Sequence, residues 1–123
     1  MKVVIKDNAD IIYGTPSTNP QYSSKYKEFY KMIAGRTLDI DTTYMFKNAL
    51  NAVMPKDTIE FLELDCKRYQ LVHLDTKYIK EVQDDIRFLF MKCQYCGDLN
   101  PIDDIVDNTC IYCKEQGYLE SLV

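Results

Sequence analysis

Residues 93–113 read CQYCGDLNPIDDIVDNTCIYC and contain two Cys-x-x-Cys pairs, Cys93/Cys96 and Cys110/Cys113, with thirteen residues between them. Two cysteines at this spacing can both face inward on one tight turn, so each pair provides one edge of a tetrahedron. Zn²⁺ takes four such ligands at about 2.3 Å from each sulfur. The spacing therefore predicts one structural Zn²⁺ held by all four thiolates, at the C-terminal end of the chain.

The four cysteines have other interpretations, namely an iron or iron–sulfur site, two disulfides, or a redox pair. A reducing compartment disfavours disulfides, and a single redox pair would leave the second pair unexplained. Ligand softness and spacing favour zinc over iron. The fifth cysteine, Cys66, lies beside Asp65 in an apolar stretch and is expected to be a small buried hydrophobic residue.

The stretch FLFMKCQYCGDL, residues 88–99, resembles the strand–knuckle–strand opening of zinc-ribbon and rubredoxin-like modules, and the resemblance covers about residues 88–118. It is incomplete, because neither pair has a proline after its first cysteine and the second pair is followed by Lys114 where the first has Gly97. The resemblance implies a closed structural metal site. It leaves the activity open, since such modules serve in transcription factors, polymerases, ribosomal proteins, enzymes and adaptors.

The tail of the module allows a second interpretation. If residues 114–122 formed a helix, the last two ligands would lie at a helix start and the site would be treble-clef-like. Gly117 within that segment would cost a helix about 1 kcal/mol, which favours the ribbon.

Hydrophobic and turn patterns divide the rest of the chain into short elements. The spacing predicts strands at 2–6, 11–13, 59–64, 69–74 and 86–91, helices at 21–34, 43–54 and about 76–85, and a loop at 14–20. Strands 59–64 and 69–74 are expected to form a hairpin around residues 65–68. The predicted fold class is α+β, a small mixed helix and sheet body (1–90) with an integrated C-terminal zinc ribbon (91–123).

Length and composition indicate a globular intracellular protein. The 123 residues are 46% hydrophobic and 12% aromatic, which suits one domain with a small appendage. No apolar run approaches the roughly 20 residues that span a bilayer, and the start MKVVIKDNAD reaches Asp7 and Asn8 too early for a signal peptide. A cytoplasmic protein without a membrane segment is expected.

Charge is unevenly distributed between the two parts of the chain. Residues 1–90 carry 13 basic and 13 acidic side chains, whereas residues 91–123 carry two basic and six acidic ones. The segment between the cysteine pairs holds four aspartates and no Lys or Arg: Asp98, Asp103, Asp104 and Asp107. These four are candidate partner-binding residues for a protein with a basic surface, and nucleic acid is not expected to bind through the zinc module.

Other interpretations of the aspartates are an ordinary solvated loop or an acidic mimic of nucleic acid. A calcium loop is not supported, because Asp103, Asp104 and Asp107 lack the alternating spacing and the distal Glu of an EF-hand.

One segment of the body favours nucleic acid instead. Four basic residues there, interleaved with Tyr22, Tyr26 and Tyr30, form a candidate single-strand-binding surface: Lys25, Lys27, Lys31 and Arg36. The alternative is that tyrosines at helical spacing face the core while the lysines extend past them to solvent.

No catalytic constellation is present in the sequence. The single histidine, His73, has a strand context typical of a structural residue, and neither a phosphate-binding loop nor a G-x-S-x-G nucleophile turn occurs. A zinc-deaminase comparison fails because Asp75 stands where a glutamate is needed and Lys92 where a proline is expected. In addition, a second cysteine pair leaves no open metal position for water.

The sequence therefore predicts a small zinc-binding regulatory or inhibitory protein, not an enzyme, which acts by binding another protein. A composition rich in Lys, Asn, Tyr and Ile is compatible with a phage or other viral accessory factor. The alternatives are a nucleic-acid-binding or transcription-complex factor, and a small-ligand binder or enzyme whose pocket involves loop 14–20.

Overall fold

The computed structural model describes residues 2–46, 49–63 and 71–123, which form two antiparallel sheets, helices and short 3₁₀ turns. The strand order is β4-β3-β2-β1-β5 in the larger sheet and β7-β6-β8 in the smaller one. The strands are β1 Lys2–Ile5, β2 Thr37–Phe46, β3 Ala49–Val53, β4 Leu71–Asp75, β5 Ile79–Val82, β6 Phe90–Cys93, β7 Leu99–Pro101 and β8 Leu119–Ser121. The helices are α1 Ala9–Tyr13, α2 Ser24–Ile33 and α3 Lys56–Phe61, with 3₁₀ turns η1 Thr76–Tyr78, η2 Asp84–Leu89 and η3 Ile102–Asp104.

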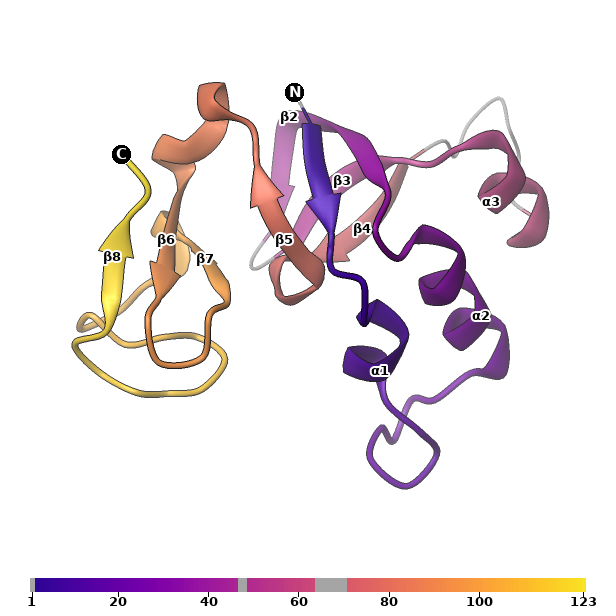
Figure 1. Ribbon diagram of the computed structural model, residues 1–123, viewed down its shortest axis with the longest axis horizontal. Helices are drawn as coiled ribbons and strands as arrows, with labels where there is room; N and C mark the ends of the chain where they lie inside the picture. Colours follow the sequence, from indigo (N-terminus) through magenta and orange to yellow (C-terminus); the bar gives the residue numbers. More distant parts are fainter. Residues whose placement is uncertain (1, 47–48, 64–70) are drawn as a thin grey trace.

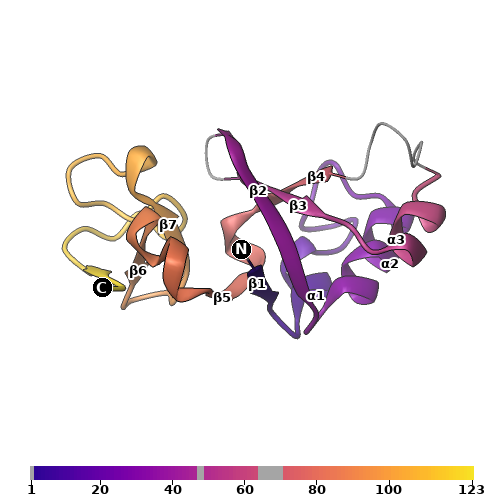
Figure 2. The same ribbon diagram turned by 90° about the horizontal axis from the view of Figure 1, so that it is seen from above.

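The three parts of the molecule follow one another along its long axis. The α-helices lie at one end, the three-stranded sheet lies at the other, and the five-stranded sheet lies between them in both views (Figures 1 and 2). The chain crosses from the larger to the smaller sheet once, through η2, between β5 and β6. The predicted α+β class is confirmed.

Strand β1 organises the larger sheet, because it pairs with β2 on one side and with β5 on the other. Val3 lies opposite Leu38 in β2 and Val82 in β5, and all three side chains are buried. Strand β3 continues the sheet by pairing along its length with β4. These strands are far apart in the sequence, so the hydrophobic pattern of one strand does not indicate which other strand it pairs with.

One hydrophobic core joins the body to the smaller sheet. Phe29 and Ile33 of α2 pack in it with Ile5, and so do Phe90 of β6 and Leu99 of β7. Complete burial of a side chain of this size contributes about 1.5–3 kcal/mol. The first hairpin of the cysteine module therefore shares the core of the body and is held firmly against it.

Two predicted strands are wrong and are helices. Residues 11–13 belong to α1, a single turn too short to show a helical period, whose Ala9 is buried while Ile12 packs on the core. Residues 59–61 belong to α3, which begins after Pro55. Proline is well suited to a helix start, and Thr58 Oγ1 donates to the Pro55 carbonyl at 2.7 Å. Pro55 directly follows the predicted helix 43–54, and in the structure it precedes α3.

The predicted helix at 43–54 is also wrong, since residues 43–46 are the end of β2 and residues 49–53 form β3. The alternation of buried Leu38, exposed Asp39 and buried Ile40 begins a period of two before the segment. Strand β3 then finds partners on both sides, β2 and β4, so every backbone group can pair. Tertiary pairing overrides the helical spacing of the apolar residues here.

The third predicted helix, 76–85, is divided into η1, β5 and the start of η2. The free side of β1 recruits residues 79–82 as a strand, with Val4 opposite Glu81. The strand predicted at 86–91 begins only at Phe90, because η2 takes residues up to Leu89 and buries Ile86.

Several predicted elements are confirmed: the strand at 2–6, the helix within 21–34, the strand ending near 74 and the loop at 14–20. The hairpin turn at 65–68 and Cys66 lie outside the described residues. Among those described, no helix has the length and apolar character needed to cross a bilayer.

Candidate metal centre

The four predicted cysteines meet at one point, with all four Sγ atoms within 4.8 Å of one another. Two of the tetrahedron's edges join the pairs: Cys93 Sγ to Cys113 Sγ and Cys96 Sγ to Cys110 Sγ, each 3.7 Å. A tetrahedron with metal–sulfur bonds of about 2.3 Å has edges of about 3.8 Å. A disulfide needs about 2.05 Å, so these edges fit a tetrahedral metal and exclude sulfur–sulfur bonds.

The two Cys-x-x-Cys turns, here called the first knuckle (93–98) and the second knuckle (110–115), share one backbone geometry. In each knuckle, the carbonyl of the first cysteine accepts from the backbone N–H four residues on: Gly97 N to Cys93 O at 2.7 Å, and Lys114 N to Cys110 O at 3.1 Å. The N–H of the same cysteine donates to the carbonyl five residues on: Cys93 N to Asp98 O at 3.0 Å, and Cys110 N to Glu115 O at 3.1 Å. Because the two knuckles have the same backbone hydrogen bonds, each cysteine pair forms an equivalent edge of the sulfur tetrahedron.

Both knuckles turn through the left-handed region at the same position. Gly97 has φ 82° and Lys114 has φ 67°. Glycine adopts this conformation without steric cost, whereas a lysine is strained there by about 1–2 kcal/mol. Lys114 Nζ donates to the Ile111 carbonyl at 2.8 Å, which offsets part of that strain within the second knuckle.

Burial follows the same order in both pairs. The first cysteine of each, Cys93 and Cys110, is fully buried, whereas Cys96 is exposed and Cys113 is intermediate. Leu119 of β8 completes the small apolar cluster around the buried pair. The site is therefore closed from the protein side and reaches solvent through the second cysteine of each knuckle.

A buried asparagine joins the knuckles. Asn100 in β7 is fully buried, and its Nδ2 donates to the Asp98 carbonyl at 3.2 Å and to Cys110 Sγ at 3.5 Å. Its Oδ1 accepts from Ile111 N at 2.7 Å. The donation to sulfur favours a thiolate, so Asn100 supports the ligand state of Cys110 and orients it.

The surroundings of Cys110 stabilise its anion. Burial raises its pKa, but donors from the Cys113 backbone, the Asn100 side chain and the Tyr112 backbone outweigh burial and lower the pKa to about 6. Metal binding requires a deprotonated thiol. Cys110 therefore meets that requirement near neutral pH before a metal arrives.

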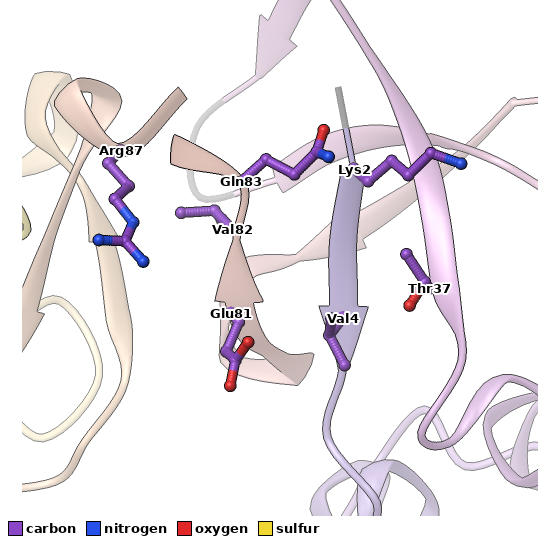
Figure 3. Close-up of a pocket in the computed structure, with 7 residues that line it drawn as sticks. All are labelled: Lys2, Val4, Thr37, Glu81, Val82, Gln83 and Arg87. Carbon is purple, nitrogen blue, oxygen red and sulfur yellow. The ribbon is translucent and has the colours of Figure 1, made fainter. Parts of the chain in front are cut away.

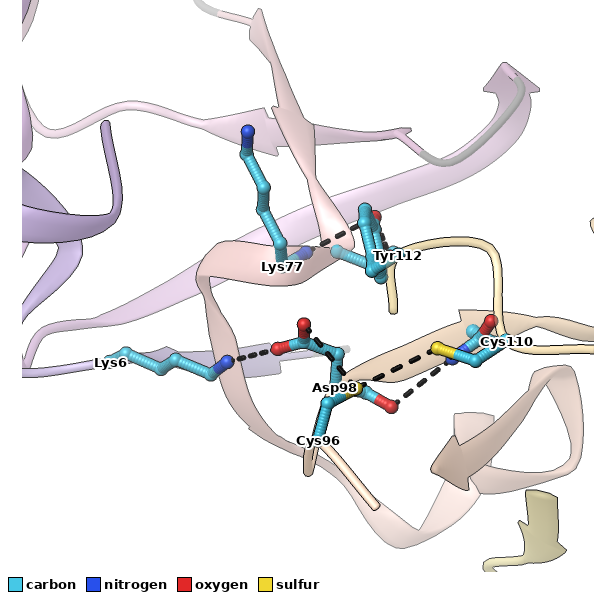
Figure 4. A network of polar contacts seen from close by, with 8 residues as sticks. Lys6, Lys77, Cys96, Asp98, Cys110 and Tyr112 are labelled. Carbon is cyan, nitrogen blue, oxygen red and sulfur yellow. Dashed lines mark hydrogen bonds and ion pairs between the residues drawn. The ribbon is translucent and has the colours of Figure 1, made fainter. Parts of the chain in front are cut away.

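A cation from the body lies beside the first knuckle. Lys6 forms an ion pair with Asp98 Oδ1, with side-chain exposures of 22% and 19%, and Asp98 Oδ2 lies 3.7 Å from Cys96 Sγ (Figure 4). Four thiolates around a divalent metal carry a net negative charge. The Lys6 ammonium would balance part of that charge, and its ion pair ties the first knuckle to the residue that directly follows β1.

The second knuckle is anchored by a hydroxyl instead. Tyr112, between the two ligands Cys110 and Cys113, forms a hydrogen bond through its Oη with Thr76 Oγ1 and accepts from Lys77 N at 3.2 Å (Figure 4). Burial raises the pKa of Tyr112 to about 12, so it stays protonated under ordinary conditions.

The tail of the module is a strand and not a helix. Residues 119–121 form β8, which pairs with β6 next to the first knuckle, with Cys93 opposite Leu119. Gly117 has φ 88° and is not helical. The treble-clef alternative, which required a helix over 114–122, is therefore wrong.

The four predicted partner-binding aspartates do not form one cluster. Asp98 is occupied by Lys6, at the junction with the body. Asp103, Asp104 and Asp107 lie on the acidic loop (102–107), where Asp103 and Asp107 are exposed. The same loop exposes two apolar side chains, Ile102 at 44% and Val106 at 70%.

The basic residues of the nucleic-acid alternative all have protein partners. Lys25 pairs with Glu63, Lys31 with Glu28 and Arg36 with Asp57, while Lys27 Nζ donates to the carbonyls of Asp10 and Gly14. The Arg36 guanidinium lowers the pKa of Asp57 through a hydrogen bond. Tyr30 stacks on Tyr78 at 4.3 Å, and Tyr13 lies against Tyr22. Tyr22 and Tyr30 thus pack against other rings, whereas Tyr26 is 48% exposed, and all four cations have protein partners.

The remaining candidates show local roles. In loop 14–20, the hydroxyl of Thr15 bonds with those of Ser17 and Thr18, and Asn19 Nδ2 donates to the Tyr13 carbonyl. His73 lies on β4 with its side chain exposed.

Sequence reasoning missed Asn100, Tyr112 and Lys6 at this centre. Tyr112 could have been found, since it lies inside the second pair. Asn100 and Lys6 carry no local signal, because their role arises only when β7 and β1 are placed beside the knuckles.

Comparison of the chain with family models, curated proteins and solved structures found no match. The metal centre is therefore established from its own geometry: four cysteines that can hold one metal ion.

Proposed function

We propose that the four cysteines hold one structural Zn²⁺ and that the chain acts as a small regulatory or inhibitory protein by binding another protein. Four thiolates at tetrahedral separation suit Zn²⁺, which has no preference for another geometry. Bound there, the ion would cross-link the two knuckles, and no ligand position would remain for a reacting water. This supports a structural role for the metal.

The observation that carries the binding proposal is the acidic loop. Exposed Ile102 and Val106 stand beside exposed Asp103 and Asp107, so one surface combines apolar contact area with negative charge. Such a surface suits a basic partner, which the carboxylates attract and the apolar side chains hold.

The metal centre supports this surface. The segment from β7 to Cys110 is fixed at one end by Asn100 and at the other by Cys110. A loop held in one conformation loses less entropy on binding, so metal-dependent order contributes to affinity. Zinc removal would then weaken partner binding without any contact between the metal and the partner.

The experiment captures partners from a lysate of the source cells on the immobilised chain. We expect wild type to retain a stoichiometric protein that elutes with salt. A variant with Ile102→Ser, Val106→Ser, Asp103→Asn and Asp107→Asn should lose it. Asparagine at 107 keeps the left-handed backbone, φ 53°, accessible.

The matched control is Ile11→Ser, which removes from α1 an isoleucine whose exposure, 69%, is similar to the 70% of Val106. This variant should retain the partner. Absence of any stoichiometric partner, or equal capture by the loop variant, would contradict the proposal. Metal analysis of the purified chain should give about one zinc per chain.

A further inference from the structure

A groove, here called the seam groove, runs from the β2–β1–β5 part of the larger sheet past η2 to the cysteine module. One part, about 600 Å³, is lined by Lys2, Val4, Thr37, Glu81, Val82, Gln83 and Arg87 (Figure 3). A smaller part, about 190 Å³, is lined by Lys80, Glu81, Val82, Arg87, Lys92, Leu99 and Leu122. The two parts share Glu81, Val82 and Arg87, so they form one continuous surface that crosses from the body to the module.

The seam groove is basic, although the chain as a whole is acidic. Its lining includes four cationic side chains, Lys2, Lys80, Arg87 and Lys92, and one acidic one, Glu81. Lys2 is paired with Asp39 at 3.5 Å. Lys80 and Lys92 are exposed and form no ion pair within the described residues. Lys92 lies opposite the exposed Glu120 in the β6–β8 pairing and forms no ion pair with it, so both lysine charges, one from each side of the seam, are accessible to a ligand.

The wall of the seam groove is the edge strand β5, the last strand of the larger sheet. Gln83 N donates to Lys2 O at 3.1 Å, so Gln83 faces β1. Backbone groups alternate in direction along an antiparallel strand, and Val82 therefore turns its own away from β1. The register shift opposite Val4 and Ile5 makes Lys80 the extra residue of a bulge, which interrupts the alternation there. An edge of this kind can accept a further strand.

The floor of the seam groove is apolar. Val82 and Leu99 are buried, and Leu122 packs against the same core. A polyphosphate chain would gain little from such a floor, whereas an extended peptide places alternate side chains on it.

We propose that the seam groove binds an extended acidic peptide of a partner protein, which adds as a strand to the free edge of β5. Alternate carboxylates of the peptide would reach Lys80 and Lys92, and the intervening apolar side chains would contact the floor. This surface is separate from the acidic loop, so the two can be tested independently.

The test measures fluorescence anisotropy of a labelled octapeptide of alternating Glu and Val at about 50 mM salt, where charge pairs are weakly screened. We expect saturable binding by the zinc-loaded chain. Lys80→Glu with Lys92→Glu should lower the affinity about tenfold or more, and Lys80→Gln with Lys92→Gln should give a smaller loss. Lys56→Glu on exposed α3, at the opposite end of the molecule (Figure 1), should change it less than about twofold.

A second probe tests strand addition itself. The same octapeptide with alternate backbone nitrogens methylated keeps its charge and loses its hydrogen bonds on one edge. We expect it to bind at least about tenfold more weakly. Equal binding of the two probes would overturn strand addition.

Three further results would overturn the proposal: no saturable binding, equal affinity in the charge-reversed variant, or tighter binding of oligothymidylate than of the peptide. The last would make the groove a nucleic-acid site. Thermal unfolding and zinc content of every variant, unchanged from wild type, establish that a lost signal reports the groove and not a lost fold.

Discussion

The first knuckle turns at Gly97 and is tied to the body by the ion pair between Asp98 and Lys6, whereas the second turns at Lys114 and is tied by the Tyr112 hydroxyl. Their backbone hydrogen bonds are otherwise equivalent. The difference shows that a metal constrains where four sulfurs lie and leaves the means of support free. One knuckle uses a permissive residue and charge, and the other uses a strained residue and neutral hydrogen bonds.

The largest effect is expected from a substitution that removes a metal ligand from either knuckle. Cys96→Ser and Cys110→Ser should each abolish zinc binding and lower the free energy of unfolding by several kcal/mol, since metal binding is coupled to folding. Metal analysis and urea unfolding measure this. Gln94→Ala, an exposed change between two ligands, is the control and should keep both properties. A variant that stays fully stable without metal would refute the structural role.

The next effect distinguishes the knuckles through Asn100. Its side chain donates to a ligand sulfur in the second knuckle, Cys110 Sγ, and to a backbone carbonyl, that of Asp98, in the first. Asn100→Asp keeps an acceptor for Ile111 N and removes the donor to Cys110. We expect a loss of about 2 kcal/mol and an about 10- to 100-fold weaker metal affinity. Asn108→Asp, the same change at an exposed site of the module, should have little effect. Equal results for the two variants would remove Asn100 from the metal centre.

The two anchors should respond differently to salt. Tyr112→Phe leaves Lys77 N without its acceptor and should cost about 1–2 kcal/mol at any ionic strength. Asp98→Asn breaks the pair with Lys6, and its cost should shrink as salt rises, because salt screens charge. Urea unfolding at low and high salt measures both. A cost for Asp98→Asn that does not change with salt would mean that the charge of the pair with Lys6 does not contribute to stability.

The stability of the metal-free chain should rise with pH between about 6 and 9. The pKa of Cys110 is lowered from 9.0 to about 6 in the folded state, so in this window the unfolded thiol binds a proton that the folded one does not. The contribution of Cys110 to the free energy of unfolding is fully present above pH 9 and is lost as the pH falls to 6. It changes by no more than about 1.4 kcal/mol per pH unit. Unfolding of chelated protein measures the slope, which Asn100→Asp should reduce. A flat or falling stability would show that Cys110 is not a folded-state thiolate.

The smallest effects exchange the two turning residues. Gly97→Ala should destabilise by about 1 kcal/mol for backbone reasons alone, because a Cβ there meets no atom within 4 Å. Lys114→Gly relieves the backbone strain and should raise the free energy of unfolding by about 0.5–1 kcal/mol. The lost hydrogen bond from Lys114 Nζ to the Ile111 carbonyl reduces this gain. Lys114→Ala loses that hydrogen bond and keeps the strained backbone, so it measures the hydrogen bond separately from the strain. Thermal unfolding measures all three, and a destabilising Lys114→Gly would show that the Nζ bond outweighs the strain.

The metal centre was predictable because its information is local. Two residues between cysteines place both thiols on one turn, and that geometry does not depend on the rest of the chain. The helix over 24–33 was likewise predictable, since Phe29 and Ile33 repeat along one face. The segment 43–54 was not, because its strand β3 pairs along its length with β4, about twenty residues further along the chain, and a local window of sequence does not contain that partner.

The sequence by itself determined the α+β class, the four thiols of one metal site, and the excess of acid in the C-terminal part. Only the tertiary structure decided that Asp98 faces Lys6 instead of a partner, that Lys27 and Arg36 are already paired, and that Lys80 and Lys92 line one groove. The physical reason is distance. Chemistry carried by neighbouring residues survives in any fold, whereas the availability of a charge depends on which strands the fold places beside it.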